Sequence, residues 1–168
     1  GIGVFVLIMA GSVFAYSMLK DNGNTDRINK STTAAANKDD DKSASVKAPD
    51  FSARDDAGQM VSLSSFFDKP TIISFWTTWC PNCRKAMPDF QKIHEEMGDS
   101  VNIVMVNATD GSQETETKAR KYIKDNGYTF KVLYDINEDA VYKYRITGIP
   151  DTYFIDADGN IITRGSGQ

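Results

Sequence analysis

Two cysteines, Cys80 and Cys83, are the residues of this 168-residue chain whose type and spacing most directly suggest chemistry. They have two residues between them in the stretch FWTTWCPNCRKAMPDF. A disulfide across so short a loop would contribute little as a structural staple, because the stabilisation grows with loop length. The spacing instead favours a working redox pair, in which one thiolate attacks a partner's disulfide and the second thiol releases the product.

Metal binding is another chemistry open to a cysteine pair. A closed zinc site takes about four ligands, and the chain offers two cysteines and one histidine, His94. A copper carrier could use fewer ligands and stays an alternative. A lone histidine in a charged helical stretch (HEE) is usually solvated, however. We therefore predict no bound metal, and the exchange mechanism calls for no cofactor.

The elements around the cysteines give the two sulfurs different roles. Residues 71–76 (TIISFW) show no alternation and are typical of a strand buried on both faces. A helix that follows directly would have Cys80 at its N-cap and Pro81 at its first position, where a missing N–H is no loss. Free N–H groups and the positive helix end then stabilise a thiolate, so we predict a lowered pKa for Cys80.

In this mechanism Cys80 is the nucleophile and Cys83, one turn into the helix, is the resolving thiol. We expect Cys83 to be the more buried and the less acidic of the two. The hypothesis requires a Cys80 sulfur that is held, ionised and reachable from solvent. Arg84 and Lys85 could add positive charge, although side chains of this kind are more often solvated.

The rest of the domain alternates strand and helix patterns from Pro49 onward. This order predicts an α/β domain over 49–168, with a central mixed sheet and helices on both faces. A further helix would be expected after Arg164 to cover one face of the sheet; because the sequence stops at Gln168, we expect the domain to be trimmed at this helix. The expected elements are a hairpin at 50–63 with a turn at 55–58, a helical turn at 64–67, a helix at 84–97 kinked at Pro88, a strand at 101–107, a helix at 115–125, a strand at 131–134, a helix at 138–144 and a hairpin at 151–164 with a turn at 157–160.

The first 48 residues differ sharply from the rest. Residues 1–19 carry no charge and would span roughly 28 Å as a helix, close to the ~30 Å hydrocarbon core of a bilayer. We predict a transmembrane anchor, with a cleaved signal peptide as the alternative. Residues 20–48 have almost no large apolar side chain, so we expect a disordered linker that tethers the domain.

The charge balance argues against nucleic acid as a partner. The chain has 19 basic and 23 acidic residues, and no basic face is dense enough to hold a phosphate backbone. We expect a monomer that acts on other proteins.

Three stretches resemble the thioredoxin superfamily: FWTTWCPNC, the proline five residues after Cys83, and GIPDTYFIDADGN. Within it, the APDF hairpin, the membrane tether and the extra segment at 115–125 are similar to TlpA/ResA-like thiol-disulfide oxidoreductases. The resemblance covers about 49–165. It implies a three-layer sandwich with an N-terminal hairpin and a helical insertion, on the extracytoplasmic side of a bacterial membrane and held there by a single-pass anchor.

The same resemblance implies how substrates dock. Pro150 should be cis, which places the backbone of Ile149 beside Cys80, where an extended substrate strand can pair with it. Trp79, Pro81, Ile149 and Pro150 would then form an apolar patch around the sulfurs. Trp76, inside the strand, is expected to belong to the core.

Three positions depart from the family pattern. Thioredoxins carry a buried Asp six residues before the first cysteine, and ResA-like members a Glu six residues after it; here these positions are Ser74 and Ala86. The residue after the cis-proline is Asp151, whose charge could raise the thiolate pKa or select basic substrates. Without either familiar acid, we favour an oxidase or isomerase of exported proteins, with a reductase of a partner redoxin or apocytochrome as the alternative.

Two other functions are less well supported. A peroxiredoxin needs a threonine three residues before its cysteine and a proline four residues before that. Thr77 meets the first requirement, but Ile73 stands in place of the proline. A copper-delivery module that uses both thiolates is the non-enzymatic alternative.

Overall fold

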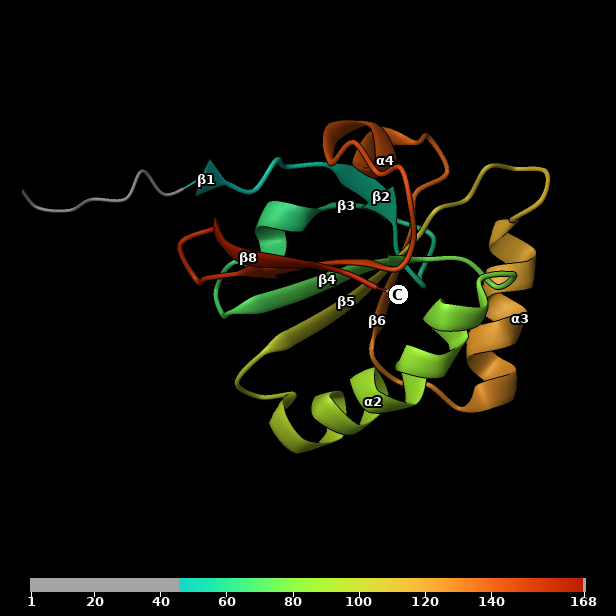
Figure 1. The fold of residues 1–168 in the computed structure, drawn as a ribbon, viewed down its shortest axis with the longest axis horizontal. Coiled ribbons are helices and arrows are strands. Elements are labelled where there is room, and N and C mark those ends of the chain that lie inside the picture. Colours follow the sequence, from blue (N-terminus) through green and yellow to red (C-terminus); the bar gives the residue numbers. More distant parts are fainter. Residues whose placement is uncertain (1–45, 168) are drawn as a thin grey trace, which may run out of the picture. The chain divides into compact units, whose positions relative to one another are not determined.

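The computed structural model describes residues 46–167 and shows eight strands and four helical segments in this part of the chain (Figure 1). The strands are β1 (Val46–Lys47), β2 (Ser52–Arg54), β3 (Met60–Ser62), β4 (Thr71–Trp76), β5 (Asn102–Asn107), β6 (Lys131–Tyr134), β7 (Asp151–Ile155) and β8 (Asn160–Ser166). The helices are the 3-10 turn η1 (Leu63–Phe66), α2 (Pro81–Met97), α3 (Glu116–Asn126) and α4 (Asp139–Lys143).

All eight strands form one mixed sheet in the order β1-β8-β7-β4-β5-β6-β2-β3. The middle strands β4, β5 and β6 are parallel, and their helical connections lie on a sheet face, as parallel crossovers require. Strands β7 and β8 are added antiparallel on one side, and β2 and β3 on the other. The cysteines follow β4, so they lie at the carboxyl end of a central strand.

Two apolar cores lie on opposite faces of the sheet. One packs α4 and η1 against the sheet through buried residues such as Leu63, Phe75 and Tyr144. The other packs α2 and α3 through Trp76, Met87 and Ile123, and it contains both cysteines. Figure 1 shows α4 on one side of the sheet and α2 and α3 on the other. The predicted three-layer α/β arrangement is therefore confirmed.

Most predicted elements of the domain are found, with small shifts at their ends. Strands β4 and β6 have the predicted bounds, and both hairpins are present. The turn before β8 holds Gly159 at φ +78°, and a side chain there would meet the Phe67 ring at 2.7 Å, so both backbone and space require glycine. Helix α2 begins at Pro81, as the N-cap argument predicts, although the apolar spacing alone indicates a start at residue 84.

The predicted linker ends too late in the sequence. Val46 and Lys47 pair with Ile161 and Asn160 as strand β1, and Ala48 is buried. These residues form a strand because the edge of β8 offers unpaired backbone N–H and C=O groups, although their own side chains are exposed. The rest of the linker and the predicted anchor at 1–19 lie outside the described residues. Within 46–167, no helix is both long enough and apolar enough to cross a bilayer.

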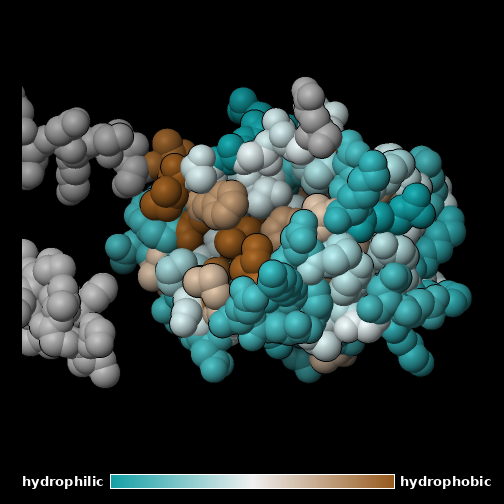
Figure 2. Space-filling view, turned by 60° about the horizontal axis from the view of Figure 1, so that its bottom comes forward, coloured by the Kyte–Doolittle hydropathy of each residue, from teal (hydrophilic) through white to brown (hydrophobic). Residues whose placement is uncertain are grey.

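Part of the sheet face that carries α2 stays open to solvent. Phe154 and Ile162 are exposed at 38% and 66%, and apolar side chains gather on this side of the molecule (Figure 2). A hollow of about 400 Å³ there is lined by Pro70, Thr71, Ile72, Val101, Phe154, Ile155, Asp156, Ile162 and Thr163. The helix predicted after Arg164 is not among the described residues, since β8 continues through that position to Ser166.

Candidate active site

The cysteines lie where a buried strand turns into a helix. Strand β4 ends at Trp76, a short loop follows, and α2 begins at Pro81. The Cys80 N–H donates to the carbonyl oxygen of Thr77 at 3.4 Å, which tightens this loop. The arrangement sets Cys80 immediately ahead of the helix axis, where unpaired N–H groups converge.

Cys80 is the N-cap of α2, as predicted. The backbone N–H of Cys83 donates to Cys80 Sγ at 3.1 Å, and Pro81 occupies the first helical position. The two cysteines are joined by a disulfide, with Cα atoms 5.3 Å apart. The lowered pKa of a reduced Cys80 stays a prediction, but the donor that would stabilise its thiolate is in place.

Cys80 is more deeply buried than the sequence-based hypothesis requires. Its exposure is 4%, against 2% for Cys83. The order of burial is as predicted, and both cysteines of the oxidised pair are almost completely covered; the reachable sulfur that the hypothesis requires stays a prediction. The physical reason is that the disulfide covers one side of Cys80 Sγ while the Ile149 carbonyl oxygen, 3.7 Å away, covers another.

The second side of the site is the loop before β7. The Ile149–Pro150 peptide bond is cis, as the resemblance implies, and it places the Ile149 carbonyl beside Cys80. Trp79 is exposed at 47% and Pro81 is exposed as well, whereas Ile149 and Pro150 are half-buried. An apolar rim of these four residues is therefore open to a partner. Its role in substrate binding remains a prediction.

Trp76 belongs to the core, as expected. It is fully buried and packs near Tyr122, with ring centroids 5.9 Å apart. Pro88 lies on the exposed side of α2, which continues through it to Met97; the kink remains a prediction. Arg84 and Lys85 are exposed, in line with the expectation of solvated side chains.

Asp151 does not offer a free charge to substrates. Its side chain is 1% exposed and accepts two hydrogen bonds from Arg164, at 2.8 Å from Nε and 2.5 Å from Nη2. These bonds raise the pKa of Arg164. The suggestion that Asp151 selects basic substrates is wrong, because the partner on β8 neutralises it inside the protein. Sequence reasoning missed Arg164, which is thirteen residues away along the chain.

Ser74 and Ala86 leave the two familiar acid positions without a carboxylate. The Ser74 hydroxyl is buried and shares a hydrogen bond with Thr152 Oγ1 at 2.9 Å. A different acid lies near the loop that carries Cys80: Glu114 is fully buried and accepts two hydrogen bonds from Thr78. No sequence signal singles it out, because QETETK before a helix is typical of an exposed turn.

The described residues contain no cluster of three or more histidine, cysteine, aspartate or glutamate side chains arranged to hold a metal ion. His94 lies near the end of α2 and is half-buried. The reactive group that the described residues place at the site is the Cys80–Cys83 disulfide.

A paired-cysteine disulfide at the start of a helix, opposite a cis-proline loop on a mixed sheet, defines a thioredoxin-like domain. Residues 44–164 match the AhpC/TSA family, and the chain belongs to that family.

Named relatives agree with this assignment. The chain is 35% identical to the thioredoxin-like protein YneN of Bacillus subtilis over 118 residues, which cover 68% of this chain and 66% of YneN. It is 35% identical to the thiol-disulfide oxidoreductase ResA of Oceanobacillus iheyensis over 131 residues, covering 74% of this chain and 66% of ResA. The matched stretches thus span slightly less than two thirds of these relatives.

A solved structure shows the same fold. The crystal structure of StoA from Bacillus subtilis superposes with a TM-score of 0.62 at 30% identity, over 71% of this chain and 88% of StoA.

Proposed function

We propose that this domain catalyses thiol–disulfide exchange on proteins through Cys80 and Cys83. The observation that carries the proposal is the disulfide at the N-terminus of α2, with Cys80 Sγ capped by the Cys83 N–H and facing the carbonyl before a cis-proline. A relative whose name is thiol-disulfide oxidoreductase supports it.

In the oxidising direction, a substrate thiolate attacks Cys80 Sγ and forms a mixed disulfide. The Cys80–Cys83 bond breaks, and Cys83 leaves with the electron pair and takes up a proton. A second substrate thiolate then attacks the substrate sulfur of the mixed disulfide and releases the Cys80 thiolate. The substrate loses two electrons and two thiol protons in forming its disulfide. The cysteine pair gains the two electrons and one proton, on Cys83, and the second proton goes to solvent while Cys80 stays a thiolate. The reductase reaction is the same sequence reversed.

We favour the oxidising or isomerising direction. A reductase must repeatedly deprotonate its buried resolving thiol, and Cys83 is 2% exposed with no carboxylate at either familiar position, Ser74 or Ala86. An oxidase that gives away its disulfide needs this deprotonation less in its forward step. Direction depends on a small free-energy gap, since about 30 mV corresponds to about 1.4 kcal/mol.

We further propose that the domain works outside the cytoplasmic membrane, tethered by residues 1–19, on exported proteins. The support is the uncharged apolar run at the N-terminus and the polar stretch that follows it. Trp79, Pro81, Ile149 and Pro150 would hold an extended substrate segment over the sulfurs.

Substrate trapping tests the proposal. Cys83→Ala, expressed in the native host, cannot resolve a mixed disulfide, so exported proteins should accumulate on Cys80. Cys80→Ala is the matched control and should trap none. Failure of the first variant to form any adduct would contradict the proposal. Exported proteins with structural disulfides among the adducts would support an oxidase, and apocytochromes or a partner redoxin would support a reductase.

A further inference from the structure

The loop between β5 and α3 places a carboxyl group inside the protein. Glu114 is fully buried, and a buried carboxyl group is costly unless its oxygens receive hydrogen bonds. Its Oε1 accepts from the backbone N–H of Thr78 at 3.0 Å and from Asn107 Nδ2 at 2.8 Å. Its Oε2 accepts from Thr78 Oγ1 at 2.6 Å. Both oxygens are therefore satisfied, and Thr78 supplies two of the three bonds.

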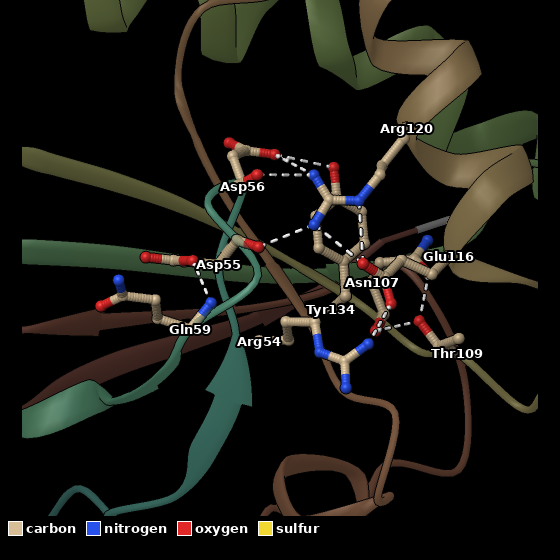
Figure 3. A network of polar contacts seen from close by, with 9 residues as sticks. All are labelled: Arg54, Asp55, Asp56, Gln59, Asn107, Thr109, Glu116, Arg120 and Tyr134. Atoms are coloured by element: carbon tan, nitrogen blue, oxygen red, sulfur yellow. Dashed lines mark hydrogen bonds and ion pairs between the residues drawn. The ribbon is translucent and has the colours of Figure 1, made fainter.

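The donors to Glu114 are all neutral. Within 46–167, no lysine, arginine or histidine forms an ion pair with it, whereas Glu116, two residues later, lies between two arginines. Figure 3 shows this second group: Glu116 pairs with Arg54 at 3.0 Å and with Arg120 at 2.8 Å, and Arg120 reaches Asp56 in the β2–β3 turn. Glu116 ties the hairpin to α3, while Glu114 points to the cysteine loop.

Glu114 is fixed from its own loop as well. Asp110 Oδ1 accepts from the N–H groups of Ser112 at 2.7 Å and of Glu114 at 3.0 Å. The Gly111 N–H donates to the Glu114 carbonyl oxygen at 3.0 Å, with Gly111 at φ +74°. These hydrogen bonds fix the backbone position of Glu114. Its carboxyl group can therefore hold Thr78 in a defined place.

The segment that Glu114 holds leads directly to Cys80. Thr78 is two residues before it, and the Cys80 N–H bonds to the carbonyl oxygen of Thr77. At the other end of the segment, the Trp76 carbonyl oxygen accepts from the Ala108 N–H at 3.0 Å. The loop is thus anchored at the strand end, at Thr78 and at Cys80.

We propose that Glu114 is a positioning residue of the disulfide site. Acting through Thr78, it fixes the loop that carries Cys80 and so aims Cys80 Sγ at the Cys83 N–H and the Ile149 carbonyl. This inference rests on the exchange function proposed above and assigns a residue that sets its geometry. It replaces neither of the missing acids in proton transfer, because none of its hydrogen bonds involves a cysteine.

The test must separate positioning from a contribution to stability alone. Thr78→Val keeps the size of the side chain and removes its hydroxyl donor, and Thr78→Ser restores that donor. Glu114→Gln keeps the shape of the acid but loses at least one of its acceptor contacts. Glu116→Gln is the matched control, since it disrupts the neighbouring arginine contacts and leaves the cysteine loop untouched.

Two measurements follow on variants whose folded fraction is checked by near-UV circular dichroism. The first is the pH dependence of Cys80 alkylation by iodoacetamide in a Cys83→Ala background. If Thr78→Val loosens the cap, the pH midpoint of Cys80 alkylation should rise toward that of free cysteine. Thr78→Ser should keep the midpoint near that of the unchanged loop. The second is the exchange rate of the oxidised domain with a fluorescent dithiol peptide. It should fall about tenfold in Thr78→Val and in Glu114→Gln, because small misplacements are costly in rate.

The double variant tests whether the two residues act as a unit. Combining Thr78→Val with Glu114→Gln should slow exchange by no more than about threefold beyond either single variant, since coupled residues are non-additive. Glu116→Gln should change both readouts less than twofold.

The inference is overturned if Thr78→Val and Glu114→Gln match Glu116→Gln in both readouts, or if the two effects multiply. The alkylation profile needs no exchange activity. A wild-type domain that fails to exchange would therefore defeat the proposed function, while the positioning of Cys80 would still be tested by alkylation.

Discussion

Two carboxyl groups are buried in segments that adjoin the disulfide, and they differ in what satisfies them. Asp151 follows the cis-proline on β7 and accepts two bonds from the guanidinium of Arg164. Glu114 precedes α3 and accepts its bonds from Thr78 and Asn107, which are neutral. Both side chains are almost completely inaccessible, at 1% and 0%.

The difference teaches that burial of an acid does not by itself assign its role. A carboxylate paired with arginine has its charge compensated within one pair, and losing either member leaves the other uncompensated. A carboxyl group held by donors of the catalytic loop transmits its position to that loop. We therefore expect Asp151 to matter most for stability and Glu114 most for reactivity.

The largest expected effect breaks the ion pair. Arg164→Ala leaves Asp151 buried without its partner, and we expect the free energy of unfolding to fall by about 3 kcal/mol. The estimate is at the lower end for buried pairs because the Arg164 side chain is 49% exposed. Urea denaturation measures it. Replacing both residues, as Asp151→Leu with Arg164→Met, should recover at least half of the unfolding free energy that Arg164→Ala loses. A double variant as unstable as Arg164→Ala would contradict this account.

Glu114→Gln should reduce the exchange rate more, and the free energy of unfolding less, than Arg164→Ala does. We expect a loss of about 1–2 kcal/mol in unfolding free energy, since one or two buried hydrogen bonds weaken without leaving a naked charge. Denaturant curves of the two variants, set beside their exchange rates per folded molecule, give the comparison. If Arg164→Ala slowed exchange more than Glu114→Gln did, the contrast between the two carboxyl groups would be lost.

Trp79→Ala sharpens the comparison by separating docking from positioning. The side chain is 47% exposed, so stability should change by no more than about 0.5 kcal/mol. Exchange with a protein substrate should slow, because the apolar rim is reduced, while reduction by dithiothreitol should keep its rate. Stopped-flow tryptophan fluorescence or thiol quenching can follow both reactions. Equal slowing with the small dithiol would argue against a docking role.

The smallest effect concerns a half-buried carboxylate, Asp156, which serves as the baseline for the two fully buried ones. The Asn160 N–H and side-chain amide lower the pKa of Asp156 below its ordinary value of 3.8. Because the pKa of Asp156 is lower in the folded than in the unfolded chain, its carboxylate stabilises the fold at any pH above its unfolded-state pKa. This contribution is lost as the pH falls through its folded-state pKa. Asp156→Asn should therefore show a slightly smaller loss of stability below pH 3.8 in denaturant curves. If Asp156→Asn lost as much unfolding free energy at low pH as the wild type does, Asp156 would not contribute to the acid sensitivity of the fold.

Much of the fold could be predicted from the sequence because its signals are local. The unbroken apolar run of β4, the glycine turns of the hairpins and Pro81 beside a capping cysteine each act within a few residues. The resemblance supplied the cis Pro150. Local signals failed for β1, where two exposed residues form a strand only because β8 offers an edge.

The site was predicted less completely, for a similar reason. Cys80, Cys83, Ile149 and Pro150 carry signals in their own motifs, and they are brought together as expected. The Arg164 partner of Asp151 and the Glu114 contact with Thr78 join distant positions, and nothing in a single sequence pairs them. The depth of Cys80 could not be inferred either, since it depends on how closely the Ile149 loop approaches.

The hydrogen bond from the Cys83 N–H to Cys80 Sγ exists while the sulfur is still uncharged in the disulfide. When the disulfide is reduced and Cys80 becomes a thiolate, the Cys83 N–H dipole already points at the negatively charged sulfur. Little reorientation of the surroundings then accompanies the change in charge. The donor that would stabilise the Cys80 thiolate is thus already in position before the disulfide is opened.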